Sequence, residues 1–248
     1  MEVELIDVMG DDASIVQAAR VSYGAGTKTP SNDTALIRYL MRHRHTTPFE
    51  MVEFKFRIKC PIFVARQHMR HRTASINEIS ARYSIIDDQY YTPGPFRKQS
   101  TENKQGSSGA LEEDVNHDIT ERYTIWCEQA FELYNYMLER GVSRELARCI
   151  LPQSTMTQFY WKINLHNLFH YLKLRTDPHA QWEIQELARM IFEHVRAKVP
   201  IATQAYQDYC METVTFTQPE ISGSIKEGTR EYSELQGKLQ TIKKCPYI

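Results

Sequence analysis

The stretch RHRTASINEISARYS, residues 70–84, crowds three arginines together with several hydrogen-bonding side chains. Arg70, Arg72 and Arg82 fall within thirteen residues, and the polar positions between them include Glu78 and Ser80. A guanidinium is a planar, permanently charged donor that matches phosphate oxygens, so the arginines predict an anionic ligand with more than one phosphate group. The glutamate and the serines would add selectivity for hydroxyl and amide groups. On charge alone, a solvated helix end with surface salt bridges is an open alternative.

A second cluster, RHRHTTPFE, residues 42–50, contains His43 and His45. Two histidines two positions apart, without a cysteine or a third nearby ligand, are a weak zinc signal, so no metal site is predicted. His45 can instead stack on a planar ring, with Thr47 and Glu50 supplying polar contacts beside it. A structural or solvated role for these loop histidines is also open.

The third cluster, INLHNLFHYLKLRTDPHAQWE, residues 163–183, has His166 and His170 four positions apart on a predicted helix. This spacing is compatible with metal binding but lacks the glutamate of an HExxH motif. Arg175 ends the same helix just before a Thr-Asp-Pro turn, so its guanidinium is expected to project into a cleft. The alternative is a helix-dipole partner or a salt bridge.

Composition limits the class of protein. The chain has 248 residues, 42% of them hydrophobic, which is enough for one sizeable core. Thirty basic and 31 acidic residues leave a net charge of -1, so anion binding must be local, and an arginine-rich RNA-binding module, which requires a basic domain, is disfavoured. The five scattered cysteines contain no CxxC pair, and the chain shows neither a signal peptide nor a membrane-spanning run. A soluble, cytoplasmic protein without a membrane or nucleic-acid partner is expected.

Hydrophobic periodicity predicts an α+β fold. Strict alternation at residues 52–60 is the clearest strand signal, and weaker strand signals lie at 2–8 and 157–164. A helix that starts at Pro61 is expected to end near residue 73 and to give way to an irregular loop. Further helices are expected at residues 11–24, from about 32, and at about 111–140, 143–151, 164–174, 179–197 and 200–211.

Two polar segments bound the predicted domain. Residues 92–109 are rich in breakers and are interpreted as a mobile surface loop inserted into one domain at residues 1–216. Residues 217–248 have few core-forming positions and are expected to form a polar C-terminal tail, either a surface helix or a partly ordered segment.

Together the three clusters resemble the flavin-dependent thymidylate synthases. RHRTASINEISARYS matches the family signature R-H-R-x-x-S-x-N-E-x-S-x-R-Y at every fixed position. The resemblance continues in order through VQAARVSY, HTTPFE, PIFVARQHMRHR, SRELARCILP and LRTDPHAQWEIQ, over roughly residues 3–211. A chance match of this kind is very improbable.

The resemblance implies conversion of dUMP to dTMP, with the carbon taken from 5,10-methylenetetrahydrofolate and the hydride delivered through FAD after reduction by NADPH. It also implies a central mixed β-sheet with flanking helices and a homotetramer whose active sites combine residues of more than one subunit. A flavoprotein oxidoreductase that binds FAD but methylates nothing is the remaining alternative.

The resemblance also assigns residues by matching position. The dUMP-binding set is Gln67, Arg70, Glu78, Ile79, Ser80, Ala81, Arg82, Arg148 and Arg175. The FAD-binding set is Ser22, Thr47, Glu50, Arg70, His71, Arg72, Thr73, Glu78, Asn164, His166 and His170. At His166 and His170 the chain departs from the Arg and Asn of the family, and Thr73 is a variable position.

Four residues, Arg82, Arg175, His45 and Ser80, carry specific expectations. Arg82 is expected to bind the nucleotide phosphate. Arg175 is the predicted catalytic cation at the uracil edge, where it would favour the N3-deprotonated ring and so activate C5. His45 is expected beside the flavin ring, at the folate or nicotinamide site. Ser80 is assigned to binding rather than to nucleophilic attack, because no activating base accompanies it in the sequence, and no cysteine has the context of a catalytic thiol.

Overall fold

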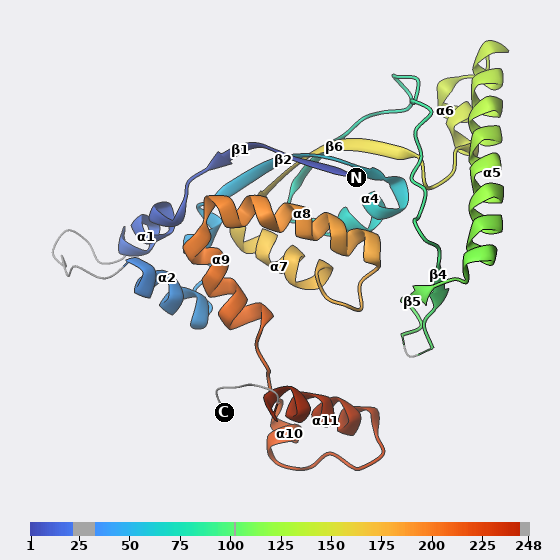
Figure 1. The fold of residues 1–248 in the computed structure, drawn as a ribbon. Helices are drawn as coiled ribbons and strands as arrows, with labels where there is room; N and C mark the ends of the chain where they lie inside the picture. Colours follow the sequence, from blue (N-terminus) through green and yellow to red (C-terminus); the bar gives the residue numbers. More distant parts are fainter. Residues whose placement is uncertain (22–32, 102, 244–248) are drawn as a thin grey trace.

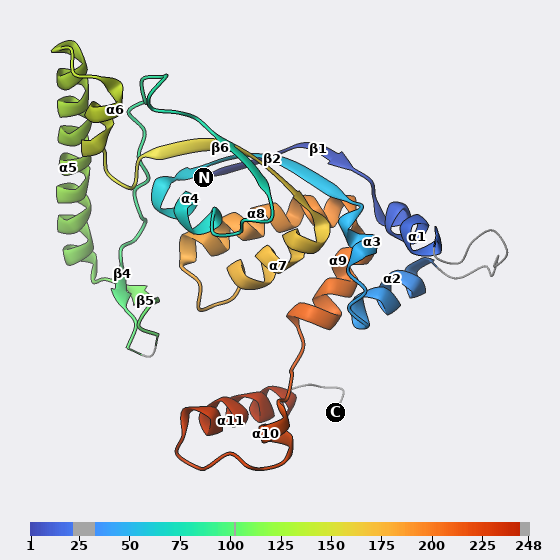
Figure 2. The same ribbon diagram turned by 180° about the vertical axis from the view of Figure 1, so that it is seen from behind.

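A four-stranded sheet with strand order β1-β2-β6-β3 lies at the centre of the protein (Figures 1 and 2). The structure is a computed structural model that describes residues 1–21, 33–101 and 103–243. The strands are β1 (Glu2–Met9), β2 (Glu53–Pro61), β3 (Ser75–Glu78) and β6 (Met156–Asn164). All three pairings are antiparallel, and Phe56 of β2 lies opposite Leu5 of β1 and Trp161 of β6.

Alternation along the central strands buries one face of this sheet. In β2, Phe54, Phe56 and Ile58 are fully buried, whereas Arg57 between them is exposed. Successive side chains of a strand point to opposite faces, so one face is apolar and the other polar. Helices α7 (Leu165–Arg175) and α8 (Trp182–Lys198) cover the apolar face (Figure 1).

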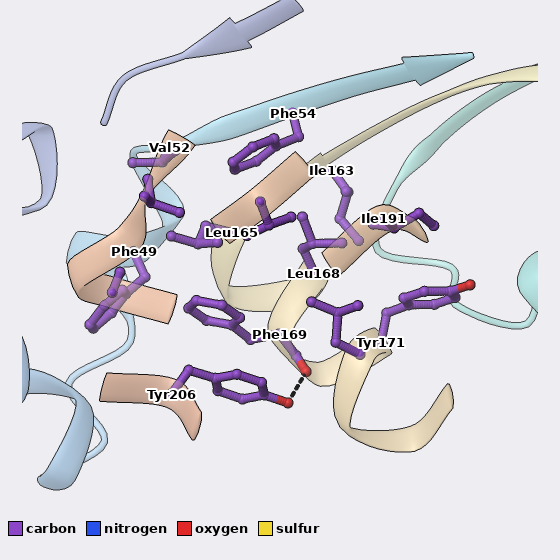
Figure 3. Close-up of a cluster of buried hydrophobic side chains, with 14 of the residues drawn as sticks. Phe49, Val52, Phe54, Ile163, Leu165, Leu168, Phe169, Tyr171, Ile191 and Tyr206 are labelled. Carbon is purple, nitrogen blue, oxygen red and sulfur yellow. Dashed lines mark hydrogen bonds between the residues drawn. The ribbon is translucent and has the colours of Figure 1, made fainter. Parts of the chain in front are cut away.

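Packing under the sheet holds α7 in one position, as Figure 3 shows. Leu165 and Leu168 of α7 are fully buried in the same cluster as Phe54. Phe169 stacks on Tyr206 with 4.2 Å between ring centroids, and the Tyr206 hydroxyl donates to the Phe169 carbonyl over 2.5 Å. Because buried contacts hold α7 against the sheet, they also determine the position of Arg175, its last residue.

Short helices cover one end of the sheet. They are α1 (Asp12–Arg20), α2 (Asp33–Arg42), α3 (Thr47–Glu50), α9 (Pro200–Tyr206) and a π-helical turn η3 (Gln207–Met211). The carboxylate of Asp12 accepts from the backbone N–H groups of Ile201 and Ala202, each over 2.9 Å. A side chain of α1 therefore satisfies the free donors at the start of α9.

Two further parts project from this body. Helix α5 (Glu113–Glu139) stands beside the sheet and contacts α6 (Arg144–Ala147) and the 3-10 turn η2 (Arg148–Ile150) (Figure 1). Helices α10 (Gln218–Ile221) and α11 (Arg230–Lys243) lie apart from the sheet (Figure 2), joined to each other by Lys238 Nζ, which donates to the Glu220 carboxylate over 2.7 Å. Throughout the described ranges, every helix is too short or too polar to cross a lipid bilayer.

The α+β class is confirmed, and so are the predicted strands at 2–8, 52–60 and 157–164 and the helices of the second half. The sheet, however, is wholly antiparallel in the described residues, where a mixed sheet was implied. Helix α1 ends at Arg20, and the predicted stop at Gly24 lies outside the described residues.

Around residue 70 the expected boundaries are wrong. Helix α4 (Ile62–His68) ends well before residue 73, because the N–H groups of Arg70 and His71 bond to carbonyls only three residues back and so close the helix in a tighter turn. Residues 75–78 form β3 rather than an irregular loop, since the backbone there pairs with β6. Within β3, Ile76, which is half-buried opposite Trp161, is the one apolar residue. A single apolar residue among polar ones gives no alternating pattern from which the sequence could predict a strand.

The polar segment at residues 92–109, for which a mobile surface loop is expected, contains regular structure. It contains β4 (Arg97–Gln99) and begins β5 (Ser107–Ala110), which pair as a two-stranded antiparallel sheet. Its side chains form hydrogen bonds to residues far away in the sequence. The composition of a segment does not reveal such contacts.

Candidate active site

Arg175, the last residue of α7, lies against the turn that follows α4. Its Nε donates to Nε2 of His71 over 3.0 Å, and its Nη2 donates to the carbonyl of Gln67 over 3.2 Å. Within the described residues no acceptor is bonded to Nη1. The guanidinium is therefore held by two fixed acceptors and keeps one nitrogen for a ligand.

His71 is an uncharged acceptor in this arrangement. Its side chain is almost completely buried, and its ring lies 4.9 Å from that of Tyr171. Burial, then the charge of Arg175 and then His170, lowers the pKa of His71 to about 4. Because Arg175 donates to Nε2, the neutral ring carries its proton on Nδ1.

A buried pair supports His71 from the core side. His68 is fully buried, and its Nδ1 lies 3.0 Å from the Tyr171 hydroxyl. Burial lowers the pKa of His68 to about 3 and raises the pKa of Tyr171, so both groups are neutral near pH 7. Sequence reasoning missed both residues, since a histidine and a tyrosine on apolar helix faces look like ordinary core positions.

Arg70 and Arg72 line a cavity of about 520 Å³ next to Arg175. His71, Thr73, His170 and Leu174 complete its lining. Both arginines are exposed, and neither forms an ion pair with a carboxylate of the described residues. The cavity thus offers three guanidinium groups to an anion. If Arg70 and Arg72 formed surface salt bridges instead, carboxylates would already occupy them.

Two further cavities continue from this one. His170 also lines a cavity of about 420 Å³ together with His45, His166 and Phe169. His45 in turn lines a third, of about 620 Å³, with Thr47. Since adjoining cavities share lining residues, they form a row along α7 and α3, which we call the α3–α7 band. It brings together most of the predicted cofactor set.

The remaining nucleotide residues lie at the other end of β3. Thr157 Oγ1 donates to Glu78 over 2.6 Å, and the Arg82 N–H donates to Ser80 Oγ over 3.3 Å. Arg82 and Glu145 approach to 3.8 Å, and Arg148 Nε donates to the Glu145 carbonyl over 3.4 Å. Arg82 lines its own cavity, of about 540 Å³. Ala81 lies in the turn with Arg82, and the N–H of Ile79, just after β3, donates to the Gln158 carbonyl of β6 over 2.9 Å.

Several predicted residues contribute to local structure. Asn164 caps α7, because its Oδ1 accepts from the Asn167 N–H over 2.9 Å. Glu50 is half-buried at the end of α3. Ser22 lies outside the described residues. No group of three or more His, Cys, Asp or Glu side chains in the described ranges is arranged to hold a metal ion.

The residues of the band fit a large, doubly charged ligand with flat rings. Arg70 and Arg72 match a diphosphate, and Phe169, Tyr206 and His45 provide apolar and ring surfaces in the adjoining cavities. The fold and this site define an α+β protein with an arginine-lined cavity suited to an anionic ligand.

Comparison with known proteins identifies the family. The family model described as "Thymidylate synthase complementing protein" matches residues 4–201. The chain belongs to this family.

Its relatives include proteins named "Flavin-dependent thymidylate synthase". One from Thermus thermophilus is 55% identical over 219 residues, which cover 88% of this chain and 80% of that protein. One from Wolbachia pipientis wMel is 50% identical over 240 residues, covering 94% and 84%. The resemblance found in the sequence is therefore confirmed.

A solved structure has the same fold. The UMP/dUMP methylase PolB from Streptomyces cacaoi, bound with 5-Br UMP, superposes with a TM-score of 0.76 at 35% sequence identity. The match covers 84% of this chain and 94% of that one.

The pKa of His71 gives the first prediction. Because its folded pKa of about 4 lies below the value of about 6.5 of an unfolded histidine, the unfolded state binds more protons between these values. This contribution should lower stability as the pH falls from about 6.5 to about 4. NMR titration of the ligand-free protein should show the His71 ring titrating near pH 4, and Arg175→Gln should move that pKa upward. A wild-type His71 that titrates near 6.5 would contradict the burial and the cation contact.

Proposed function

We propose that this enzyme methylates dUMP to dTMP, using 5,10-methylenetetrahydrofolate as carbon donor and NADPH, through FAD, as reductant, and releasing tetrahydrofolate. The observation that carries the proposal is the guanidinium of Arg175, held by His71 and by the Gln67 carbonyl in a cavity that Arg70 and Arg72 also line. The names of the relatives and the methylase activity named for PolB support it.

The α3–α7 band would hold FAD. Arg70 and Arg72 would bind its diphosphate, and His45 would lie beside its flavin ring at the folate or nicotinamide site. Bound FAD supplies hydride transfer, which protein side chains cannot provide. The other members of the FAD set are Ser22, Thr47, Glu50, His71, Thr73, Glu78, Asn164, His166 and His170. Asn164 would act mainly by fixing the start of α7, since its side-chain oxygen Oδ1 already accepts the capping bond from the Asn167 N–H.

Arg175 would act on the uracil ring electrostatically. A fixed cation beside the ring lowers the pKa of N3–H, and the resulting charge makes C5 a better nucleophile. His71 serves this role because it is neutral and positions the guanidinium without cancelling its charge. Gln67 and Arg70 would contact the same nucleotide.

The phosphate of dUMP would bind among the nucleotide residues at the end of β3 and beyond it. These are Glu78, Ile79, Ser80, Ala81, Arg82 and Arg148. Arg82 and Arg148 supply the cations. Ser80 binds rather than attacks, because its Oγ accepts from the Arg82 N–H and no histidine or carboxylate of the described residues is bonded to it.

A homotetramer with shared sites is part of the proposal. Arg175 and Arg82 line separate cavities of one chain, so a second copy would bring the two halves of a nucleotide site together. Helix α5 supports such assembly, since Trp126 and Leu133 are about half exposed on it.

The division into a catalytic unit at residues 1–216 and a C-terminal unit at 217–248 is likewise proposed, on the separation of α10 and α11 in Figure 1. A cytoplasmic location would match the supply of dUMP and reduced folate.

The activity can be tested by omission. The purified enzyme should form dTMP from dUMP only when FAD, NADPH and 5,10-methylenetetrahydrofolate are all present, as measured by chromatography of the nucleotides. NADPH oxidation without any dTMP would instead indicate a simple flavoprotein oxidoreductase.

Arg175→Ala should lower the rate of dTMP formation about 100-fold or more, because the cation that stabilises the charged ring is lost. FAD content, measured from its visible absorbance, should be retained. Arg196→Ala, which removes an exposed arginine paired with Glu193 on the surface of α8, is the matched control and should keep full activity. Near-normal turnover in Arg175→Ala would remove the uracil-edge role.

Shared sites can be tested by mixing two inactive variants. If Arg175 and Arg82 act from different copies, co-refolded Arg175→Ala and Arg82→Ala chains should regain about a quarter of wild-type activity, because hybrid sites with both arginines then form. Each variant refolded alone is the control. Sedimentation should show four chains of 29.1 kDa. A mixture as inactive as its components, at tetramer mass, would place both arginines in one chain.

A further inference from the structure

A buried carboxylate lies at the start of α8, outside the set that the family resemblance assigns. Glu183 is 1% exposed. It accepts from the guanidinium of Arg97, from Gln181 Nε2 over 2.8 Å and from the Tyr91 hydroxyl over 3.5 Å. A charge in the interior is costly unless its hydrogen bonds are satisfied, and here three donors converge on it.

The cation that pairs with Glu183 is Arg97, which lies in the polar segment that contains β4 and β5. Arg97 of β4 bonds to Glu183 and lies over the ring of Trp182, 5.1 Å from its centroid. Asn103 Nδ2 from the same segment donates to the His179 carbonyl over 3.4 Å. The β4–β5 hairpin is therefore attached at two points soon after Arg175: at His179 in the connection between α7 and α8, and at Glu183 in the first turn of α8.

Gln181 carries the contact from Glu183 toward the nucleotide residues. Its amide nitrogen donates to Glu183, and its carbonyl accepts from Gln67 Nε2. The Gln67 backbone carbonyl in turn accepts from Arg175 Nη2 over 3.2 Å. A line of hydrogen bonds thus runs from Arg97 through Glu183, Gln181 and Gln67 to Arg175.

The negative charge of Glu183 determines which end of each glutamine amide donates and which end accepts. An ionised carboxylate only accepts, so the amide nitrogen of Gln181 must face it and the carbonyl must face Gln67. Gln67 must then turn its own nitrogen toward Gln181, which leaves its Oε1 free to accept from a ligand. Both amides would be free to flip if Glu183 were neutral or displaced.

We propose that Glu183, Arg97 and Gln181 are positioning residues for nucleotide binding, and that the β4–β5 hairpin thereby orients the Gln67 amide and supports Arg175. The inference deepens the proposed function and depends on it, because it takes Gln67 and Arg175 as contacts of dUMP. The polar insertion is in this view part of the active-site framework.

The test compares dUMP affinity by calorimetry in the FAD-loaded enzyme. Arg97→Ala should weaken dUMP binding about tenfold, since the loss of a hydrogen bond to a charged group frees the carboxylate and both amides. Arg97→Lys should recover part of the affinity. Lys98→Ala is the matched control: it removes the neighbouring cation of β4, which pairs with Glu112 at the surface, and should stay within about twofold of wild type. Equal affinities of Arg97→Ala and Lys98→Ala overturn the inference.

Glu183→Gln provides a second variant of nearly the same shape, which preserves packing while removing the charge. It should weaken dUMP binding to a similar degree without loss of FAD, and unchanged affinity overturns the inference.

A double-mutant cycle separates positioning from general destabilisation. In a Gln67→Ala background, Arg97→Ala should weaken binding by less than about twofold, because the amide through which it acts is gone. A full tenfold further loss overturns the inference alone. A wild-type enzyme that binds no dUMP overturns the proposed function and the inference with it.

Discussion

The bond from Arg175 Nε to His71 Nε2 is the interaction on which the rest of the site depends. It joins the end of α7 to the turn after α4, two segments that are far apart in the sequence. The bond requires a neutral histidine, and burial beside a guanidinium supplies this condition by lowering the pKa of His71 to about 4. The histidine directs the cation without neutralising it, which is the property needed at the edge of a ring that develops negative charge.

Packing of the hydrophobic core places Arg175 and His71 close enough to form this bond. The buried face of the sheet and the contacts of Leu168, Phe169 and Tyr206 hold α7 (Figure 3), while His68 and Tyr171 fill the space beneath His71. Close-packed interiors resist displacement, so a residue at the end of a buried helix is positioned more accurately than one on a free loop. The cationic groups themselves stay at the surface, where Arg70 and Arg72 need not be desolvated.

Local charge, rather than net charge, distinguishes this protein. The chain is almost neutral overall, yet three guanidinium groups line one cavity, and no carboxylate of the described residues is part of its lining. Glu183 is bonded to Arg97 and Gln181, and Glu78 accepts from Thr157. Membership of the thymidylate synthase complementing protein family agrees with this arrangement, because that chemistry brings an anionic nucleotide and a dinucleotide cofactor together.

The sequence by itself determined the α+β class, the alternating strand β2, most helices and the family, because hydrophobic periodicity and a fixed motif are local properties of the chain. It also assigned Arg70 and Arg72 to FAD and Arg70 and Arg175 to dUMP, and the structure places these three arginines around one cavity. Only the tertiary structure decided the end of α4, the strand at residues 75–78 and the pairing of the polar segment 92–109, since each depends on contacts with distant residues. For the same reason it alone revealed His68, Tyr171 and Glu183. The effect of these side chains comes from burial and from partners across the fold, and neither is written in residue type or spacing.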